Sequence, residues 1–129
     1  MLQPGIKAEK SLTVTDANTA KTMGSGSLDV LATPAMVAMM EHAACLALED
    51  TLEPGLTTVG VEMQVSHVSA TPVGMKVWAE ATLTQTDGRQ YVFDITAYDT
   101  AGVIGKATHK RASVKVEKFM VKTQAKLSE

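Results

Sequence analysis

A single long helical segment in a chain otherwise rich in strand patterns is the feature that most constrains the fold. Residues 35–48 are rich in Ala, Met and Leu and contain no Gly or Pro. Thr33 and Pro34 precede them and suit the N-cap and the first helical position. Glu53-Pro54-Gly55 closes the region. We therefore expect one central helix that begins after Thr33 and ends near Leu48.

The other ordered segments alternate apolar and polar residues, which is typical of strands. We expect strands at Ser11–Thr15, Leu56–Ser69, Met75–Thr86, Tyr91–Tyr98 and Val103–Val116. Asp87-Gly88 is a hairpin signal, and residues 99–102 form another turn. Residues 16–29 are expected to form a loop, and residues 120–129 a frayed tail. After the helix we expect four strands in a meander. These features predict an α+β fold, in which an antiparallel sheet of about five strands wraps one helix, as in the hot-dog fold.

Composition narrows the function classes. The 129 residues suit one domain, spanning residues 1–129, and a net charge of −2 argues against nucleic acid or an anionic membrane as a partner. No apolar run is long enough to cross a membrane, and residues 1–10 do not resemble a secretory signal. The single Cys45 cannot form an intrachain disulfide. We expect a cytoplasmic protein without a metal site, because no metal-ligand spacing is present.

Three polar residues fall where apolar ones are expected. Glu41 lies four residues from both Val37 and Cys45, at or beside the apolar face of the helix. Thr33 lies about 80° away around the helix axis. His67 is in phase with Val59, Val61, Met63 and Val65 on the following strand. A buried carboxylate or imidazole is costly unless it is paired or used in chemistry.

Each of these residues also has a structural interpretation. Thr33 can be a simple N-cap, Glu41 can reach solvent from the edge of the apolar face, and His67 can be a satisfied histidine near a strand end. His42 and His109 are weaker candidates, since His109 belongs to a polar series with Arg111 on the last strand. The three residues together favour a reactive groove between helix and sheet.

Several motifs of the chain resemble the fluoroacetyl-CoA thioesterase-like group of hot-dog proteins. The motifs are residues 32–37, residues 40–45, Gly60-Val61, residues 65–67, residues 70–74, residues 105–112 and residues 117–119. The resemblance implies that Thr33, Glu41 and His67 are catalytic and that the backbone of Gly60 contacts the substrate. It also implies a homodimer with active sites near the subunit interface. Coenzyme A would be part of the substrate, and no separate cofactor is expected.

The resemblance also has a point of departure. The fluoroacetyl-specific member has phenylalanines before the catalytic threonine, which form a lid over the acyl group. Here that segment is Met23-Gly24-Ser25-Gly26-Ser27-Leu28, without an aromatic residue. We predict an acyl-CoA thioesterase that cleaves a short-chain acyl-CoA to the free acid and CoA. The alternatives are a non-enzymatic acyl-CoA-binding module and an enoyl-CoA hydratase or dehydratase.

Overall fold

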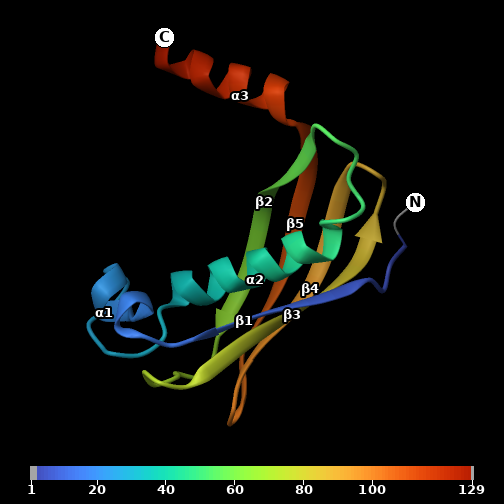
Figure 1. Cartoon of the computed structure of the whole chain (residues 1–129). Helices are drawn as coiled ribbons and strands as arrows, with labels where there is room; N and C mark the ends of the chain where they lie inside the picture. Colours follow the sequence, from blue (N-terminus) through green and yellow to red (C-terminus); the bar gives the residue numbers. More distant parts are fainter. Residues whose placement is uncertain (1–2, 129) are drawn as a thin grey trace.

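One long helix lies across a curved antiparallel sheet (Figure 1). The computed structural model describes residues 3–128. In chain order the elements are strand β1 (Lys7–Thr13), the 3-10 turn η1 (Asp16–Asn18), helices α1 (Ala20–Met23) and α2 (Thr33–Leu48), strands β2 (Leu56–His67), β3 (Lys76–Thr86), β4 (Gln90–Asp99) and β5 (Gly102–Lys115), helix α3 (Val116–Gln124) and the 3-10 turn η2 (Ala125–Ser128). The α+β hot-dog architecture is confirmed, with five strands around one central helix.

The strand order of the sheet is β1-β3-β4-β5-β2. Strands β3, β4 and β5 form the expected meander, but the prediction that β2 also belongs to it is wrong. β2 pairs with β5 at one edge of the sheet, while β1 takes the free side of β3. Three inter-strand spacings separate β2 from β3 in this order, so the connection between them must cross about 14 Å of the sheet. The segment 68–75 between them can reach up to about 27 Å, so the chain can cross the sheet.

Helix α2 packs its apolar face mainly against β1 and β3. The buried residues of the helix are Ala35, Met36, Met39, Met40, Ala43, Ala44, Ala47 and Leu48. They meet inward side chains such as Val77 and Leu83 of β3 and Phe93 of β4. The half of the sheet formed by β5 and β2 contacts α2 much less. Polar side chains of those two strands therefore lie beside the helix rather than beneath it.

A β-bulge in β2 changes which of its residues face the helix. The pairing with β5 runs from Gly60 opposite Arg111 to Glu62 opposite Lys110, so Val61 is the extra residue. Met63, Val65 and His67 share the inward face as predicted, but the prediction is wrong for Val61, whose side chain is exposed, and for Val59, which lies out of phase with inward Gly60. Before the bulge, Thr58 and Gly60 are the inward residues, opposite Ser113 and Arg111.

Two segments predicted to be irregular are helical. In the expected loop 16–29, Thr15 and Thr19 cap the short elements η1 and α1 through their hydroxyl oxygens. Residues 120–128 of the expected tail also differ from the prediction, because they belong to α3 and η2, while residue 129 lies outside the described residues. Helix α3 projects away from the sheet (Figure 1) and leaves Val116, Phe119 and Met120 exposed. Neither α3 nor any other helix among residues 3–128 is long and apolar enough to cross a membrane.

Candidate functional site

Thr33 and His67 form a side-chain pair at the N-terminal end of α2. The Thr33 hydroxyl oxygen lies 2.7 Å from His67 Nδ1. The N-cap of α2 is Ala32, with extended backbone angles, so Thr33 is the first helical residue and not the predicted N-cap. Its hydroxyl is therefore free to bind the histidine at the end of β2. We call Thr33 and His67 the outer pair.

The imidazole of His67 is only half-buried, yet one of its nitrogens is enclosed. Its Nε2 atom is buried and has no hydrogen-bond partner within residues 3–128. Burial lowers the pKa of His67, and the backbone of Ser69 acts in the opposite direction. The neutral ring therefore persists to a lower pH than in an exposed histidine. The outer pair borders a depression of about 270 Å³, whose lining includes Ser25 and Val30.

Glu41 lies two turns further along α2, at the edge of its buried face. Its side chain is 41% exposed, so the carboxylate is neither buried in the core nor free in solvent. A Cβ atom placed on Gly60 would lie 2.8 Å from Glu41 Oε2, closer than real Cβ contacts allow. The absence of a side chain at Gly60 thus lets the carboxylate lie directly against the backbone of β2.

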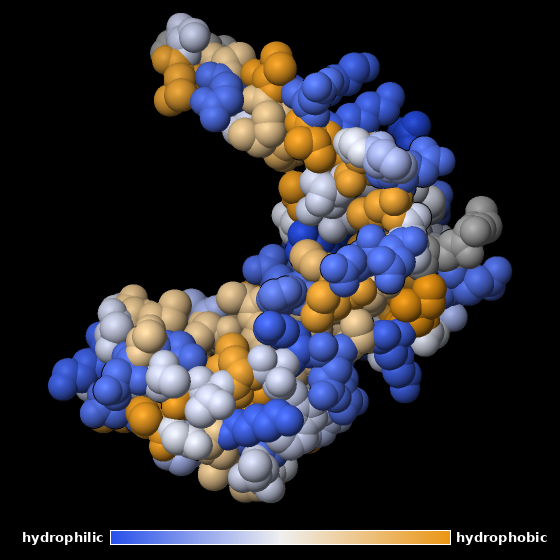
Figure 2. All heavy atoms as spheres, viewed as in Figure 1, coloured by the Kyte–Doolittle hydropathy of each residue, from blue (hydrophilic) through white to orange (hydrophobic). Residues whose placement is uncertain are grey.

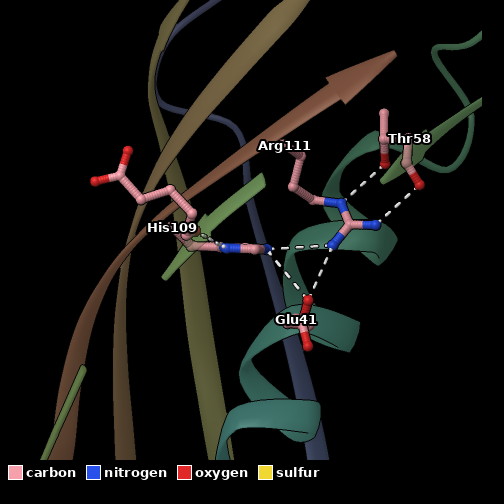
Figure 3. A network of polar contacts seen from close by, with 5 residues as sticks. Glu41, Thr58, His109 and Arg111 are labelled. Atoms are coloured by element: carbon pink, nitrogen blue, oxygen red, sulfur yellow. Dashed lines mark hydrogen bonds and ion pairs between the residues drawn. The ribbon is translucent and has the colours of Figure 1, made fainter. Parts of the chain in front are cut away.

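Two further polar residues, both from β5, face Glu41 (Figure 3). Arg111 Nη1 lies 3.6 Å from Glu41 Oε2, and His109 Nε2 lies 3.9 Å from the same oxygen. Arg111 donates from Nε to the Thr58 hydroxyl and from Nη2 to the Thr58 carbonyl, both at 2.9 Å. We call Glu41, Thr58, His109 and Arg111 the inner network.

His109 and Arg111 are almost completely buried, with side-chain exposures of 1% and 7%. Sequence reasoning rated His109 as a weak candidate and missed Arg111, because both were assigned to a polar face. They share the period-two phase of buried Ala107. The alternation of Ala107, His109 and Arg111 along β5 is the pattern from which both polar residues could have been placed on the inward face.

The structure assembles the four predicted site residues as two separate pairs. Thr33 binds His67, and Glu41 lies against Gly60. No hydrogen bond links the outer pair to Glu41 in the described part of the chain. Eight residues of helix place Thr33 and Glu41 about 12 Å apart along the axis. A substrate lying along α2 can therefore meet the two groups at different points.

The arrangement offers proton-transfer groups and a fixed positive charge. Burial lowers the pKa of His109. The Arg111 charge acts in the same direction, and the backbone of Glu62 and the Glu41 carboxylate oppose it.

Within residues 3–128, no group of three or more His, Cys, Asp and Glu side chains is placed to hold a metal ion.

Comparison with known proteins identifies the family. A family model described as fluoroacetyl-CoA-specific thioesterase matches residues 14–117. The fluoroacetyl-CoA thioesterase of Streptantibioticus cattleyicolor is 39% identical over 98 residues, which cover 76% of this chain and 70% of that protein.

Solved structures agree with this assignment. A crystal structure of fluoroacetyl-CoA thioesterase FlK is 31% identical, covers 98% of both chains and superposes with a TM-score of 0.92. A mutant of FlK in complex with acetyl-CoA is 31% identical, with a TM-score of 0.91 and coverage of 97% of this chain and 98% of that one. A thioesterase superfamily member from Thermus thermophilus is 25% identical, with a TM-score of 0.89 and coverage of 99% and 97%. This chain therefore belongs to the fluoroacetyl-CoA-specific thioesterase family of hot-dog proteins and is a thioester hydrolase.

Proposed function

We propose that the protein hydrolyses short-chain acyl-CoA thioesters and that Glu41, Thr33 and His67 perform the chemistry. The observation that carries this proposal is the position of the Glu41 carboxylate. It is partly exposed, lies against the bare backbone at Gly60, and has the Arg111 guanidinium 3.6 Å away. A carboxylate held in this way can accept a proton or attack a carbonyl beside it.

In the general-base route, Glu41 takes a proton from water while the water oxygen forms a bond to the thioester carbon. The C–S bond then breaks, and the CoA thiolate leaves and takes up a proton. In the covalent route, the Glu41 carboxylate attacks the thioester carbon, the C–S bond breaks and the CoA thiolate leaves and takes up a proton. Water then hydrolyses the resulting anhydride to the free acid and the Glu41 carboxylate. After a single turnover in ¹⁸O-labelled water, ¹⁸O in Glu41 would establish the covalent route with water attack at the Glu41 carbon.

The outer pair is assigned to positioning and proton transfer. The Thr33 hydroxyl lies 2.7 Å from His67 Nδ1 and can orient the ring. The enclosed Nε2 atom of His67 has no hydrogen-bond partner within residues 3–128, so it would be available to a water molecule once an opening of the site exposes it. Gly60 is assigned to substrate contact, because its missing side chain leaves the backbone of β2 bare directly beside the Glu41 carboxylate.

The acyl specificity is proposed to be broad. The lining of the depression beside the outer pair includes the small residues Ala20, Ser25 and Ala70 and no aromatic side chain other than His67. Segment 23–28 contains no aromatic side chain that can form a rigid wall over the acyl group. We expect turnover of more than one short acyl-CoA, with little preference for fluoroacetyl-CoA beyond its greater intrinsic reactivity.

The test is a thiol-release assay with acetyl-, propionyl-, butyryl- and fluoroacetyl-CoA under one condition. Comparable kcat/KM values are expected. A preference for fluoroacetyl-CoA of several orders of magnitude would contradict broad specificity. Binding of CoA esters without thiol release would instead indicate a binding module, and hydration of an enoyl-CoA without hydrolysis would indicate a hydratase.

We further propose a homodimer in the cytoplasm. Strand β2 ends the sheet with an unpaired edge, a common site of strand pairing between subunits. Figure 2 shows the molecule curving around a hollow, with α3 on one side and the region of α1 on the other. The exposed apolar residues Val116, Phe119 and Met120 of α3 favour a partner there. Sedimentation showing a stable monomer at micromolar concentration would refute the dimer, and cell fractionation tests the location.

A further inference from the structure

We propose that His109 is a positioning residue that acts as a neutral hydrogen-bond acceptor for Arg111 and so holds the guanidinium at a fixed place beside Glu41. The inference rests on the proposed role of Glu41 in hydrolysis. It concerns a buried histidine that the proposed chemistry does not use directly. Its basis is the set of partners around the ring (Figure 3).

The partners of His109 determine which nitrogen carries the proton. Nδ1 lies 2.8 Å from the backbone carbonyl of Glu62, which can only accept a hydrogen bond. Nε2 lies 3.2 Å from Arg111 Nη1, which can only donate. The ring therefore satisfies both partners only when it is neutral, with its proton on Nδ1 and a lone pair on Nε2.

The charged groups around the ring come from two elements. Arg111 lies on the same strand, and Glu41 approaches from α2. Burial is the main cause that lowers the pKa of His109, and the Arg111 charge adds to it. The environment is thus consistent with the neutral ring that the hydrogen bonds require.

The acceptor at Nε2 completes the fixation of Arg111. Thr58 accepts from Nε through its hydroxyl and from Nη2 through its carbonyl. His109 accepts from Nη1, so all three nitrogens of the guanidinium have a partner on the sheet. Under this restraint Nη1 stays 3.6 Å from Glu41 Oε2, outside the range of a tight charged hydrogen bond.

This separation has a consequence for Glu41. Without the acceptor, Nη1 is free to close on the carboxylate and form a tight ion pair. A tight ion pair makes a carboxylate a weaker base and a weaker nucleophile. His109 therefore keeps the arginine close enough to provide positive charge, but far enough away to leave Glu41 reactive.

Two substitutions separate the two hydrogen bonds of the ring. In His109→Asn the amide nitrogen replaces Nδ1 and keeps the bond to Glu62, but no acceptor reaches Arg111. In His109→Gln the amide group replaces Nε2 and offers its oxygen to Arg111, while the bond to Glu62 is lost. His42→Gln is the matched control, because His42 is an exposed histidine on α2.

We expect thiol release and stability to rank the two variants in opposite order. His109→Asn should lower kcat about tenfold or more and move the acidic limb of the pH profile of kcat to lower pH. Its Tm should nevertheless be higher than that of His109→Gln. His109→Gln should retain more activity but have the lower Tm. His42→Gln should match the wild type in both measurements. Activity that follows Tm across the variants, or full activity in His109→Asn, would overturn the proposal.

A second measurement is independent of activity. The ¹⁵N shifts of His109, assigned by comparison with His109→Gln, should show a neutral ring protonated at Nδ1 at neutral pH. A ring protonated at Nε2 would overturn the proposal. If Glu41→Gln kept full activity, the role of Glu41 would fail, and the ¹⁵N shifts would still decide whether His109 accepts from Arg111.

Discussion

The outer pair and the inner network lie on the same side of α2 but are built differently. The outer pair is a single hydrogen bond between an exposed threonine and a half-buried histidine. The inner network fixes a buried arginine through three hydrogen bonds to Thr58 and His109. A group with one partner can reorient during a reaction, whereas a fully anchored charge stabilises developing charge without reorganisation. The difference suggests a division between proton movement in the outer pair and fixed electrostatics in the inner network.

Removing the charge of Glu41 should have the largest effect. Glu41→Gln conserves the side-chain volume, so we expect the fold to be retained and kcat to fall about 10²-fold or more. Thiol release and circular dichroism measure the two properties. Glu62→Gln is the control, because that carboxylate lies on the outer side of β2 with Gln64 and Lys110 as its partners. Full activity in Glu41→Gln would remove this residue from the chemistry.

Arg111→Lys should have the next largest effect, and it should act on both rate and stability. Lysine keeps the positive charge but cannot reproduce the forked contacts with Thr58. We expect kcat to fall about tenfold and the free energy of unfolding to fall by about 1–3 kcal/mol, because buried acceptors lose their donors. Urea unfolding and thiol release measure these changes.

The same substitution at exposed Arg89 serves as the control for Arg111→Lys. Unchanged activity and stability in Arg111→Lys would show that charge alone matters in the inner network. The contrast between a fixed network and an adjustable pair would then be lost.

Thr33→Val should reduce the rate with little change in stability. The hydroxyl bonds His67 and does not cap α2, so its loss should lower kcat several-fold and change the free energy of unfolding by less than about 0.5 kcal/mol. Thr33→Ser keeps the hydroxyl and should restore the rate. A stability loss of about 1 kcal/mol, typical of a lost N-cap, would instead support a capping role.

The pH dependence of stability should show the smallest effect. Burial lowers the pKa of both His67 and His109 below the usual value of 6.5, so the unfolded chain binds more protons than the folded chain as the pH falls through 6.5. Stability should therefore decrease below about pH 6.5 and level off above it. Thermal unfolding at pH 5 and pH 7.5 tests this, and His67→Gln should reduce the difference. A higher Tm at pH 5 would contradict the direction of both shifts.

Local patterns were sufficient to predict most secondary structure. The helix over residues 35–48 and the hairpin at Asp87-Gly88 were confirmed, and Asp87 accepts hydrogen bonds from the amides of Arg89 and Gln90. The position of β2 beside β5 could not be predicted in the same way, because it depends on long-range pairing. The bulge at Val61 was also hidden, since the alternation of valines appears continuous in the sequence.

The site was only partly predictable for a related reason. Thr33, Glu41 and His67 stood out as polar residues on apolar faces, and the proximity of Thr33 to His67 follows from the fold. Arg111 did not stand out, because a charged residue on a strand ordinarily faces solvent. Its burial depends on its contacts with Thr58 of β2 and Glu41 of α2, which form only in the assembled tertiary structure.

The extra residue in β2 determines which residues of this strand face the candidate site. On one side of Val61 the even-numbered residues Thr58 and Gly60 face inward, and on the other side the odd-numbered residues Met63 to His67 do so. Deleting Val61 itself would leave regular alternation with the same inward residues, whereas deleting a residue on either side of the bulge would turn the inward residues of that side outward. Point substitutions at Val61 leave this geometry unchanged. Over evolutionary time, β2 should therefore tolerate changes at Val61 far better than insertions or deletions elsewhere in the strand.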